Sequence, residues 1–96
     1  MISSNEQVLK DVINNLVKRY KLEYGIVSTR IINSWESVAG ELIAKHTENI
    51  YVRGDTLYIK LDSAALKDEL SYAKEKLVKA INSAVEKEAI KTIVFM

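Results

Sequence analysis

Four residues of one short stretch have the side chains that contact nucleic acids. They fall at alternate positions of two neighbouring runs and are Tyr51, Arg53, Tyr58 and Lys60. Aromatic rings stack on bases and cationic groups neutralise phosphates, so these residues on an open sheet face would suit single-stranded nucleic acid. The same residue types also occur on hairpins without a ligand, because cross-strand aromatic pairs stabilise sheets. The sequence leaves both interpretations open.

A hairpin would place these side chains together. Two β-prone runs, Ile50–Arg53 and Thr56–Leu61, flank the pair Gly54–Asp55. Glycine adopts the positive φ that a tight turn between such runs requires. Strand alternation then places an aliphatic face opposite the tyrosines and cations, and its residues on the second strand are Leu57, Ile59 and Leu61.

Lysines after the hairpin form a second candidate contact with nucleic acid. Lys74 and Lys76 are the first of a series, which could form a phosphate-tracking stripe if the fold gathers it on one side; its other members are Lys79, Lys87 and Lys91. Acidic residues alternate with these lysines, a pattern typical of a solvated helix face.

Trp35 and His46 are the only residues of their types. Trp35 lies on an apolar helical stripe, which favours core packing, whereas a partly exposed indole would be a partner-binding anchor. His46 has no cysteine or ligand spacing beside it that would indicate a metal. We therefore expect no catalytic residue, no metal site and no cofactor, and not an enzyme.

Helices must cover the aliphatic face of the hairpin. The apolar stripe from Val8 to Tyr20 predicts a first helix packed on the core. The segment Lys21–Val27, which contains Gly25, is interpreted as a connection. A second helix, capped by Ser28 or Thr29, would carry Trp35 and continue through Gly40, where either a close backbone or a bend is expected.

The remaining residues predict helix and one more strand. A third helical segment runs to about Glu86, with a bend near Ser71–Tyr72 because an unbroken helix would be long for this domain. Ile90–Phe95 reads as a strand that alternates poorly, as a central strand buried on both faces would. The fold class is α+β, a small three-stranded sheet packed on helices, in the order α-α-β-β-α(α)-β.

Composition limits the alternatives. The 96 residues suit a single domain spanning 1–96. A net charge of +1 gives no whole-molecule argument for nucleic acid, so any such site must come from local clustering. No apolar run approaches the ~20 residues of a membrane span, and the N-terminus lacks a secretion signal. We expect a soluble, cytoplasmic protein.

A longer pattern of residues, from about Ile32 to Phe95, is similar to the pattern of a known protein family. Its first part is Trp35, Val38, Gly40, Ile43, His46 and Thr47. Its second part is Leu57, Ile59, Ser63, Leu66, Glu69, Leu70, Leu77, Ile81, Asn82, Ile90, Ile93 and Phe95. In this order and spacing the residues resemble the bacterial DciA family.

The resemblance implies a role in DNA replication. The family is linked to loading or operating the replicative helicase DnaB and to binding DNA. For this chain we expect DNA, single-stranded or forked, and DnaB as partners. It also implies a K-homology-like domain, and part of the predicted order, α-β-β-α-α-β, is compatible with the type II version.

Departures from the family pattern limit what carries over. No Gly-x-x-Gly loop occurs, so the K-homology grip on a nucleic-acid backbone is not expected here. Many relatives have a further segment beyond this domain, whereas this chain ends at Met96. If that segment engages the helicase in the relatives, this chain would use its folded surface or bind less strongly. The absence of cysteine excludes the zinc ribbon of some relatives. The glycine that often precedes the last strand is replaced by Glu86–Glu88.

Two functions remain open. The first is a non-enzymatic, DNA-associated adaptor that binds and loads or regulates DnaB. The second is a protein-interaction module, a homodimer or hetero-complex without nucleic-acid contact, which the near-zero net charge favours. A small enzyme would need a pocket with converging polar groups.

Overall fold

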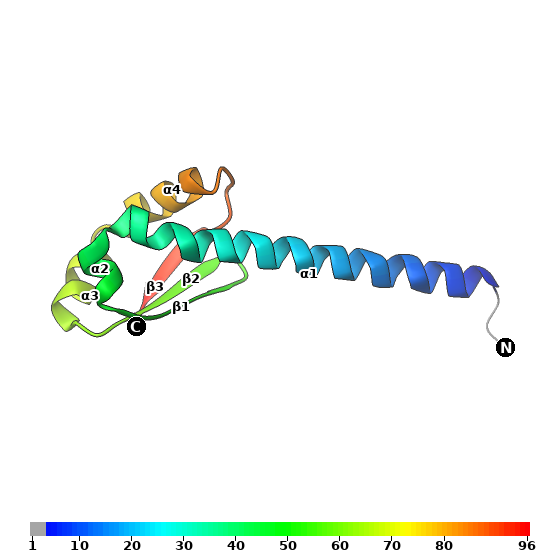
Figure 1. Cartoon of the computed structure of the whole chain (residues 1–96), viewed down its shortest axis with the longest axis horizontal. Coiled ribbons are helices and arrows are strands. Elements are labelled where there is room, and N and C mark those ends of the chain that lie inside the picture. The colour runs from blue at the N-terminus through cyan, green and yellow to red at the C-terminus, as the bar shows by residue number, and fades with distance from the viewer. Residues whose placement is uncertain (1–3) are drawn as a thin grey trace.

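A three-stranded sheet packs against helices in the computed structural model, which describes residues 4–96 (Figure 1). The elements are α1 (Ser4–Ala39), α2 (Glu41–Lys45), β1 (Thr47–Arg53), β2 (Thr56–Leu61), α3 (Ala64–Ser71), α4 (Lys74–Ala84) and β3 (Thr92–Phe95). The α+β class and the predicted order of elements are confirmed. The likeness to a type II K-homology domain stays a prediction.

The hairpin has the predicted turn and faces. β1 pairs antiparallel with β2, and Gly54 in the turn has a φ of 63°, in the left-handed region that favours glycine. Tyr51 lies opposite Tyr58 in the register. β1 begins at Thr47, three residues earlier than the β-prone run indicates.

The position of β3 corrects one prediction. The strand order is β1-β2-β3, with β3 parallel to β2, so β2 is the central strand and β3 lies at an edge. β3 is short, and its burial alternates, with Ile93 and Phe95 buried and Thr92 exposed. The expected central strand buried on both faces is therefore wrong. Loop residues before Thr92 had obscured the alternation.

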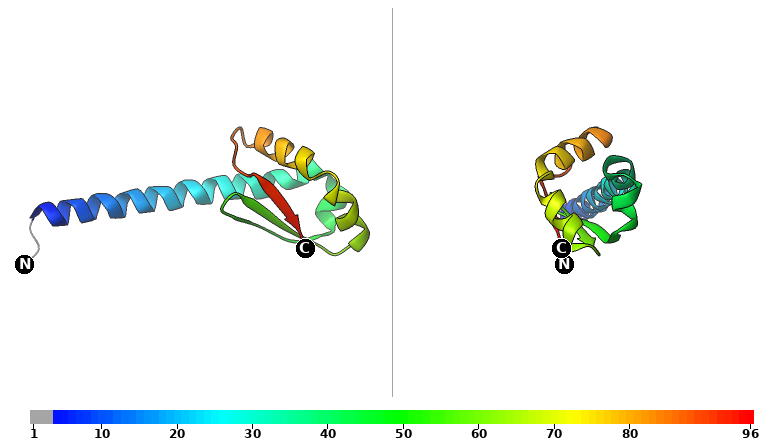
Figure 2. Two further views of the ribbon diagram at one scale, coloured as in Figure 1. Left: turned by 180° about the vertical axis from the view of Figure 1, so that it is seen from behind. Right: turned by 90° about the vertical axis from the view of Figure 1, so that its left-hand side faces the viewer.

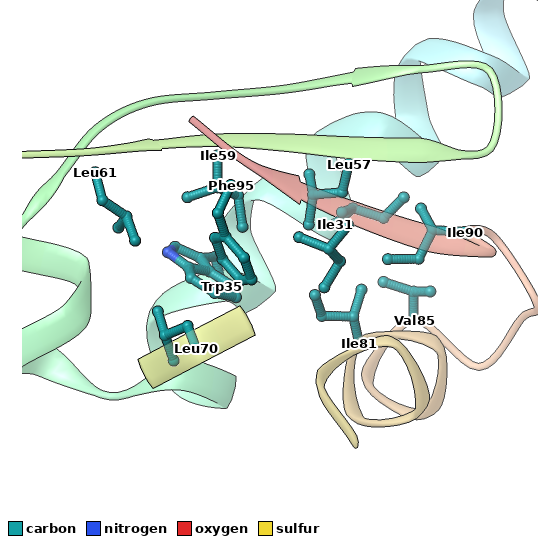
Figure 3. Packing of buried hydrophobic residues seen from close by; sticks show 11 residues of the cluster. Ile31, Trp35, Leu57, Ile59, Leu61, Leu70, Ile81, Val85, Ile90 and Phe95 are labelled. Carbon is teal, nitrogen blue, oxygen red and sulfur yellow. The ribbon is translucent and has the colours of Figure 1, made fainter. Parts of the chain in front are cut away.

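The core lies between the sheet and the helices α1 and α4 (Figure 3). Leu57 and Ile59 of β2 are completely buried, and they contact the same apolar cluster as Ile31 of α1 and Ile81 of α4. The other members are Trp35, Leu61, Leu70, Val85, Ile90, Ile93 and Phe95. The aliphatic face predicted for β2 is thus the face that forms the core.

α1 is one helix of 36 residues, so the predicted connection at Lys21–Val27 is wrong. An exposed glycine costs a helix only about 1 kcal/mol, and the chain has no proline to interrupt the backbone hydrogen bonds. A Cβ atom added at Gly25 would meet no other atom within 4 Å. Thr29 donates to the carbonyl of Gly25 over 2.9 Å, inside the continuous helix, instead of capping a new one.

The apolar stripe near the start of α1 is not in the core, contrary to the prediction. Its side chains are 46–70% exposed and are Val8, Leu9, Val12, Ile13, Leu16, Val17 and Tyr20. Packing on the sheet begins further along the helix, where Val27 is partly buried and Ile31 is buried. A helical stripe shows which side chains share a face but does not show that the rest of the chain covers them.

The first part of α1 therefore projects away from the domain in two opposite views (Figures 1 and 2). The molecule is 63 Å long but only 24 Å and 19 Å across. Its radius of gyration is 18.1 Å, compared with about 13 Å for a compact domain of 100 residues. We call residues 5–20, all exposed, the arm.

Gly40 ends α1 instead of lying inside a helix. Its φ of 94° is in the region that side chains disfavour, and its backbone separates α1 from α2. A Cβ atom there would meet no other atom within 4 Å. The sequence predicted either a close backbone approach or a bend at this glycine. The chain changes direction there, and no other backbone comes close.

The third helical segment is divided, as the sequence indicated. α3 ends at Ser71 and α4 begins at Lys74. Ser63 is the N-cap of α3, where its hydroxyl accepts a hydrogen bond of 3.3 Å from the backbone N–H of Leu66. The break lets Leu70 and Ile81 both reach the core from one short stretch of chain.

The end of α4 contains a non-glycine residue with a left-handed backbone. Glu86 has a φ of 55°. The N–H of Glu86 bonds to the carbonyl of Ser83 and the N–H of Lys87 to the carbonyl of Asn82, the two bonds of a Schellman motif. The Asn82 side chain also holds the following loop through the backbone of Ala89 and Ile90.

Replacing Glu86 with glycine should stabilise the fold. A left-handed residue with a Cβ atom costs about 1–2 kcal/mol, and the extra freedom of unfolded glycine offsets part of the gain. We expect a net increase of about 0.5–1 kcal/mol in the free energy of unfolding, measured by urea denaturation. Glu86→Ala removes the same charge but keeps the Cβ atom, so it should show no such gain. Equal stabilisation by both variants would contradict the backbone explanation.

Candidate nucleic-acid interface

The outer face of the sheet gathers the four predicted residues. We call Tyr51, Arg53, Tyr58 and Lys60 the outer sheet face. The rings of Tyr51 and Tyr58 stack across the two strands, with centroids 4.9 Å apart and planes 11° from parallel. The guanidinium carbon of Arg53 lies 5.9 Å from the centroid of the Tyr51 ring, within cation–π distance.

The outer sheet face is not covered by a helix. α1 and α4 supply the core that packs on the opposite face, where Leu57 and Ile59 lie. Arg53 and Lys60 are exposed, and the two stacked tyrosines are partly buried. Lys60 also lies 3.6 Å from a carboxylate oxygen of Glu48, an exposed pair that contributes little to stability.

The tyrosine stack leaves only part of each ring for a ligand. Each ring uses one face for the other tyrosine, and Arg53 approaches Tyr51 as well. The Tyr51 hydroxyl points toward Met96, whose sulfur is 4.0 Å away. The rings therefore act as a cross-strand pair in this structure, and a bound strand would meet the ring edges and the flanking cations.

A second cationic site lies between α4 and β3. Lys74 and Lys79 of α4 and Lys91 before β3 line a shallow groove of about 200 Å³. The other lining residues are Glu75, Val78 and Thr92. We call this the lysine groove. Lys91 lies 3.9 Å from Asp55, whereas no carboxylate of residues 4–96 is within ion-pair distance of Lys74 or Lys79.

The lysine series is therefore gathered only in part. Lys76 is exposed on α4 but does not line the lysine groove, and Lys87 lies beside other depressions, one of them next to Tyr20 and Tyr24. Lys91 shares one groove with Lys74 and Lys79 because α4 lies beside the edge strand β3. The sequence could indicate the series but not which members meet.

Trp35 is a core residue. It is 3% exposed, its ring lies 6.4 Å from that of Phe95, and its indole N–H donates to the Thr47 hydroxyl over 3.0 Å. Thr47 in turn donates to the carbonyl of Ile43. Core packing, the favoured interpretation, is confirmed. A partner anchor requires an exposed indole, whereas Trp35 leaves only 3% of its surface accessible.

His46 has a partner that sequence analysis missed. Its Nδ1 atom lies 2.7 Å from a carboxylate oxygen of Asp62, and both side chains are about two-fifths exposed. The backbone N–H of Asp62 also donates to the carbonyl of His46. The two residues tie the start of β1 to the end of β2, which is a structural role. Among residues 4–96, no three His, Asp or Glu side chains converge as metal ligands would.

Tyr24 is a further residue that sequence analysis missed. Its hydroxyl donates to the carbonyl of Val52 over 3.0 Å and accepts from the N–H of Gly54 over 3.2 Å. These bonds fasten the hairpin turn to α1. Because 28 residues separate Tyr24 from Val52, no local pattern could have shown the contact.

No described helix, α1 included, carries an apolar stretch that is long enough to cross a bilayer.

Comparison with known families adds one match. Residues 8–95 match the family model described as "Dna[CI] antecedent, DciA". The match covers nearly the whole chain and includes the arm from Val8 onward. No curated protein matches the sequence.

The tyrosine stack can be tested by a double-mutant cycle with Tyr51→Ala and Tyr58→Ala. Aromatic cross-strand pairs contribute roughly 0.5–1.5 kcal/mol beyond the area that they bury. We expect a coupling free energy in this range from urea unfolding of the two single variants and the double variant. Pairing Tyr58→Ala with Lys45→Ala, on α2, should give additive effects. Additivity in the tyrosine pair would contradict the stack.

Proposed function

This chain belongs to the DciA family, and we propose that it is a non-enzymatic adaptor that binds DNA and loads or regulates the replicative helicase DnaB. Family membership connects the chain with helicase loading in DNA replication. The observation that supports direct DNA contact is the uncovered outer sheet face, with its stacked tyrosines flanked by Arg53 and Lys60. As a replication factor, the protein would act in the cytoplasm.

The outer sheet face suits a single strand of DNA. Arg53 is exposed, and no carboxylate of the described chain lies within ion-pair distance of it, so its charge is available for a phosphate. The edges of Tyr51 and Tyr58 offer apolar contact to an unpaired base beside that phosphate. Lys60 would exchange its exposed pair with Glu48 for a phosphate at little cost.

The lysine groove would extend the contact along the backbone of the nucleic acid. Phosphates attract Lys74, Lys79 and Lys91 without regard to sequence, and the lack of base-reading contacts suits a factor that acts at many sites. Glu75 in the same groove weakens the local potential. We therefore expect modest affinity with a steep dependence on salt.

A protein-interaction module without DNA contact is the second candidate. The net charge of +1 favours it, as do the ion pairs that engage Lys60 and Lys91. The two candidates differ in one measurable respect, since only the adaptor requires DNA affinity that depends on these cations.

Fluorescence anisotropy with labelled single-stranded and forked DNA tests the DNA contact. The triple variant Lys74→Ala, Lys79→Ala, Lys91→Ala should weaken binding and reduce the slope of log affinity against log salt by about 2–3 units, about one for each phosphate that a lysine no longer neutralises. Arg53→Ala should reduce it by about one.

Lys45→Ala is the matched control for these variants. Lys45 is an exposed lysine on α2, paired with Glu41 over 3.4 Å and outside both proposed surfaces. It should leave the salt slope unchanged. No DNA binding by the wild-type protein at low salt would exclude direct contact and favour the second candidate.

DnaB binding tests the other part of the proposal. In a pull-down from the native cell, the tagged full chain should retain DnaB. With purified components, it should increase the amount of DnaB on circular single-stranded DNA. Failure to bind DnaB in both assays would contradict the adaptor function, whatever the DNA measurements show.

A further inference from the structure

The arm exposes an apolar face that the rest of a single chain leaves largely uncovered. Its aliphatic side chains have exposed fractions from 46% at Val17 to 62% at Val8, and Tyr20 is 70% exposed. Monomeric proteins seldom expose a continuous apolar patch of more than a few hundred Å². The arm also projects clear of the sheet and the other helices (Figures 1 and 2).

The exposed stripe continues the face that α1 buries in the core. Leu9, Tyr20 and Ile31 are spaced by 11 residues, which is close to three turns of an α-helix, so they lie on one line along α1. Ile31 is 1% exposed because the sheet covers it. The same line of side chains is covered by the sheet at Ile31, near the C-terminal end of the helix. It is uncovered at Leu9 and Tyr20, toward the N-terminal end.

We propose that the arm pairs with the arm of a second copy of this chain, through the stripe centred on Leu9, Ile13, Leu16 and Tyr20. A two-fold interface requires one self-complementary surface, and a stripe of Leu, Val and Ile is such a surface for helix packing. This inference stands apart from the proposed function, since it needs neither DNA nor DnaB.

The size of the stripe suits a homodimer. With seven side chains about half exposed, each arm offers on the order of 600 Å² of apolar surface, so two arms would bury about 1,200 Å² in total, the lower limit of a standard specific interface. A helix pair in register covers the whole length of both stripes.

The charges of the arm and the following turn allow self-pairing. Residues 5–23 carry four cations, Lys10, Lys18, Arg19 and Lys21, and three anions, Glu6, Asp11 and Glu23, which gives a net charge of +1. Two such segments repel each other little at physiological ionic strength. A strongly charged partner would find no complementary field here, which favours a second copy.

Sedimentation of the full chain across a concentration series tests the dimer. The mass should rise from 10.9 kDa to twice that value as the concentration increases. Ile13→Asp places a charge in the centre of the proposed interface and should leave a monomer throughout the series. The surface depression beside Ile13 is lined only by other residues of the arm, so the thermal unfolding of the domain and the fluorescence of Trp35 should stay unchanged in this variant.

Leu22→Asp is the matched control. Leu22 is 65% exposed on the same helix. It is nine positions after Ile13, which corresponds to two and a half helical turns, so it lies on the opposite face. This variant should dimerise as the wild type does. A wild type that is monomeric up to about 100 µM would overturn the proposal, since it excludes a Kd in the micromolar range.

Engineered cysteines report on the interface directly, because the chain has none of its own. Ile13→Cys should form a disulfide-linked dimer on mild oxidation, whereas Leu22→Cys should not. Equal cross-linking of both would contradict the assigned face. A wild-type dimer that Ile13→Asp leaves intact would instead assign the interface to another surface. A monomer whose DnaB binding is lost in Ile13→Asp would assign the stripe to the helicase.

Discussion

The burial of β2 against two helices is the contact on which the rest of the structure depends. Leu57 and Ile59 are fully buried, and they share a cluster with Ile31 of α1 and Ile81 of α4. A sheet of three strands is stable only when one face is packed. Because side chains alternate along β2, the same packing that buries Leu57 and Ile59 turns Tyr58 and Lys60 to the other side. The outer sheet face is thus a consequence of the core.

The hairpin could be predicted from the sequence because its signals are local. Alternation over six residues and one glycine at the turn determine which side chains share a face. The helix α1 could not be predicted in the same way. The apolar residues from Val8 to Tyr20 have the same spacing whether a sheet or a second molecule covers them, and an exposed glycine such as Gly25 disfavours a helix too weakly to end it. The pattern indicated a face but not its partner.

The candidate interface also has one part that local sequence signals could predict and one part that they could not. Tyr51 and Tyr58 could be placed together because only the turn separates them, whereas the lysine groove joins Lys74 to Lys91 across a helix and a loop. The contacts of His46 with Asp62 and of Tyr24 with the hairpin turn also cross long stretches of sequence. The residue types indicated which side chains to consider for the interface. Which of them lie together depends on how α4 and α1 pack against the sheet.

The continuity of α1 determines how the arm is oriented relative to the sheet. One unbroken helix carries the apolar arm at one end and packs on the sheet at the other, with Tyr24 fastening it to the hairpin turn. A helix transmits its direction over its whole length, so whatever binds the arm is held at a defined angle to the outer sheet face. Two connected helices with a flexible link would lose that relation. For the adaptor function that we propose, one continuous helix over residues 4–39 would fix the position of one bound macromolecule relative to another.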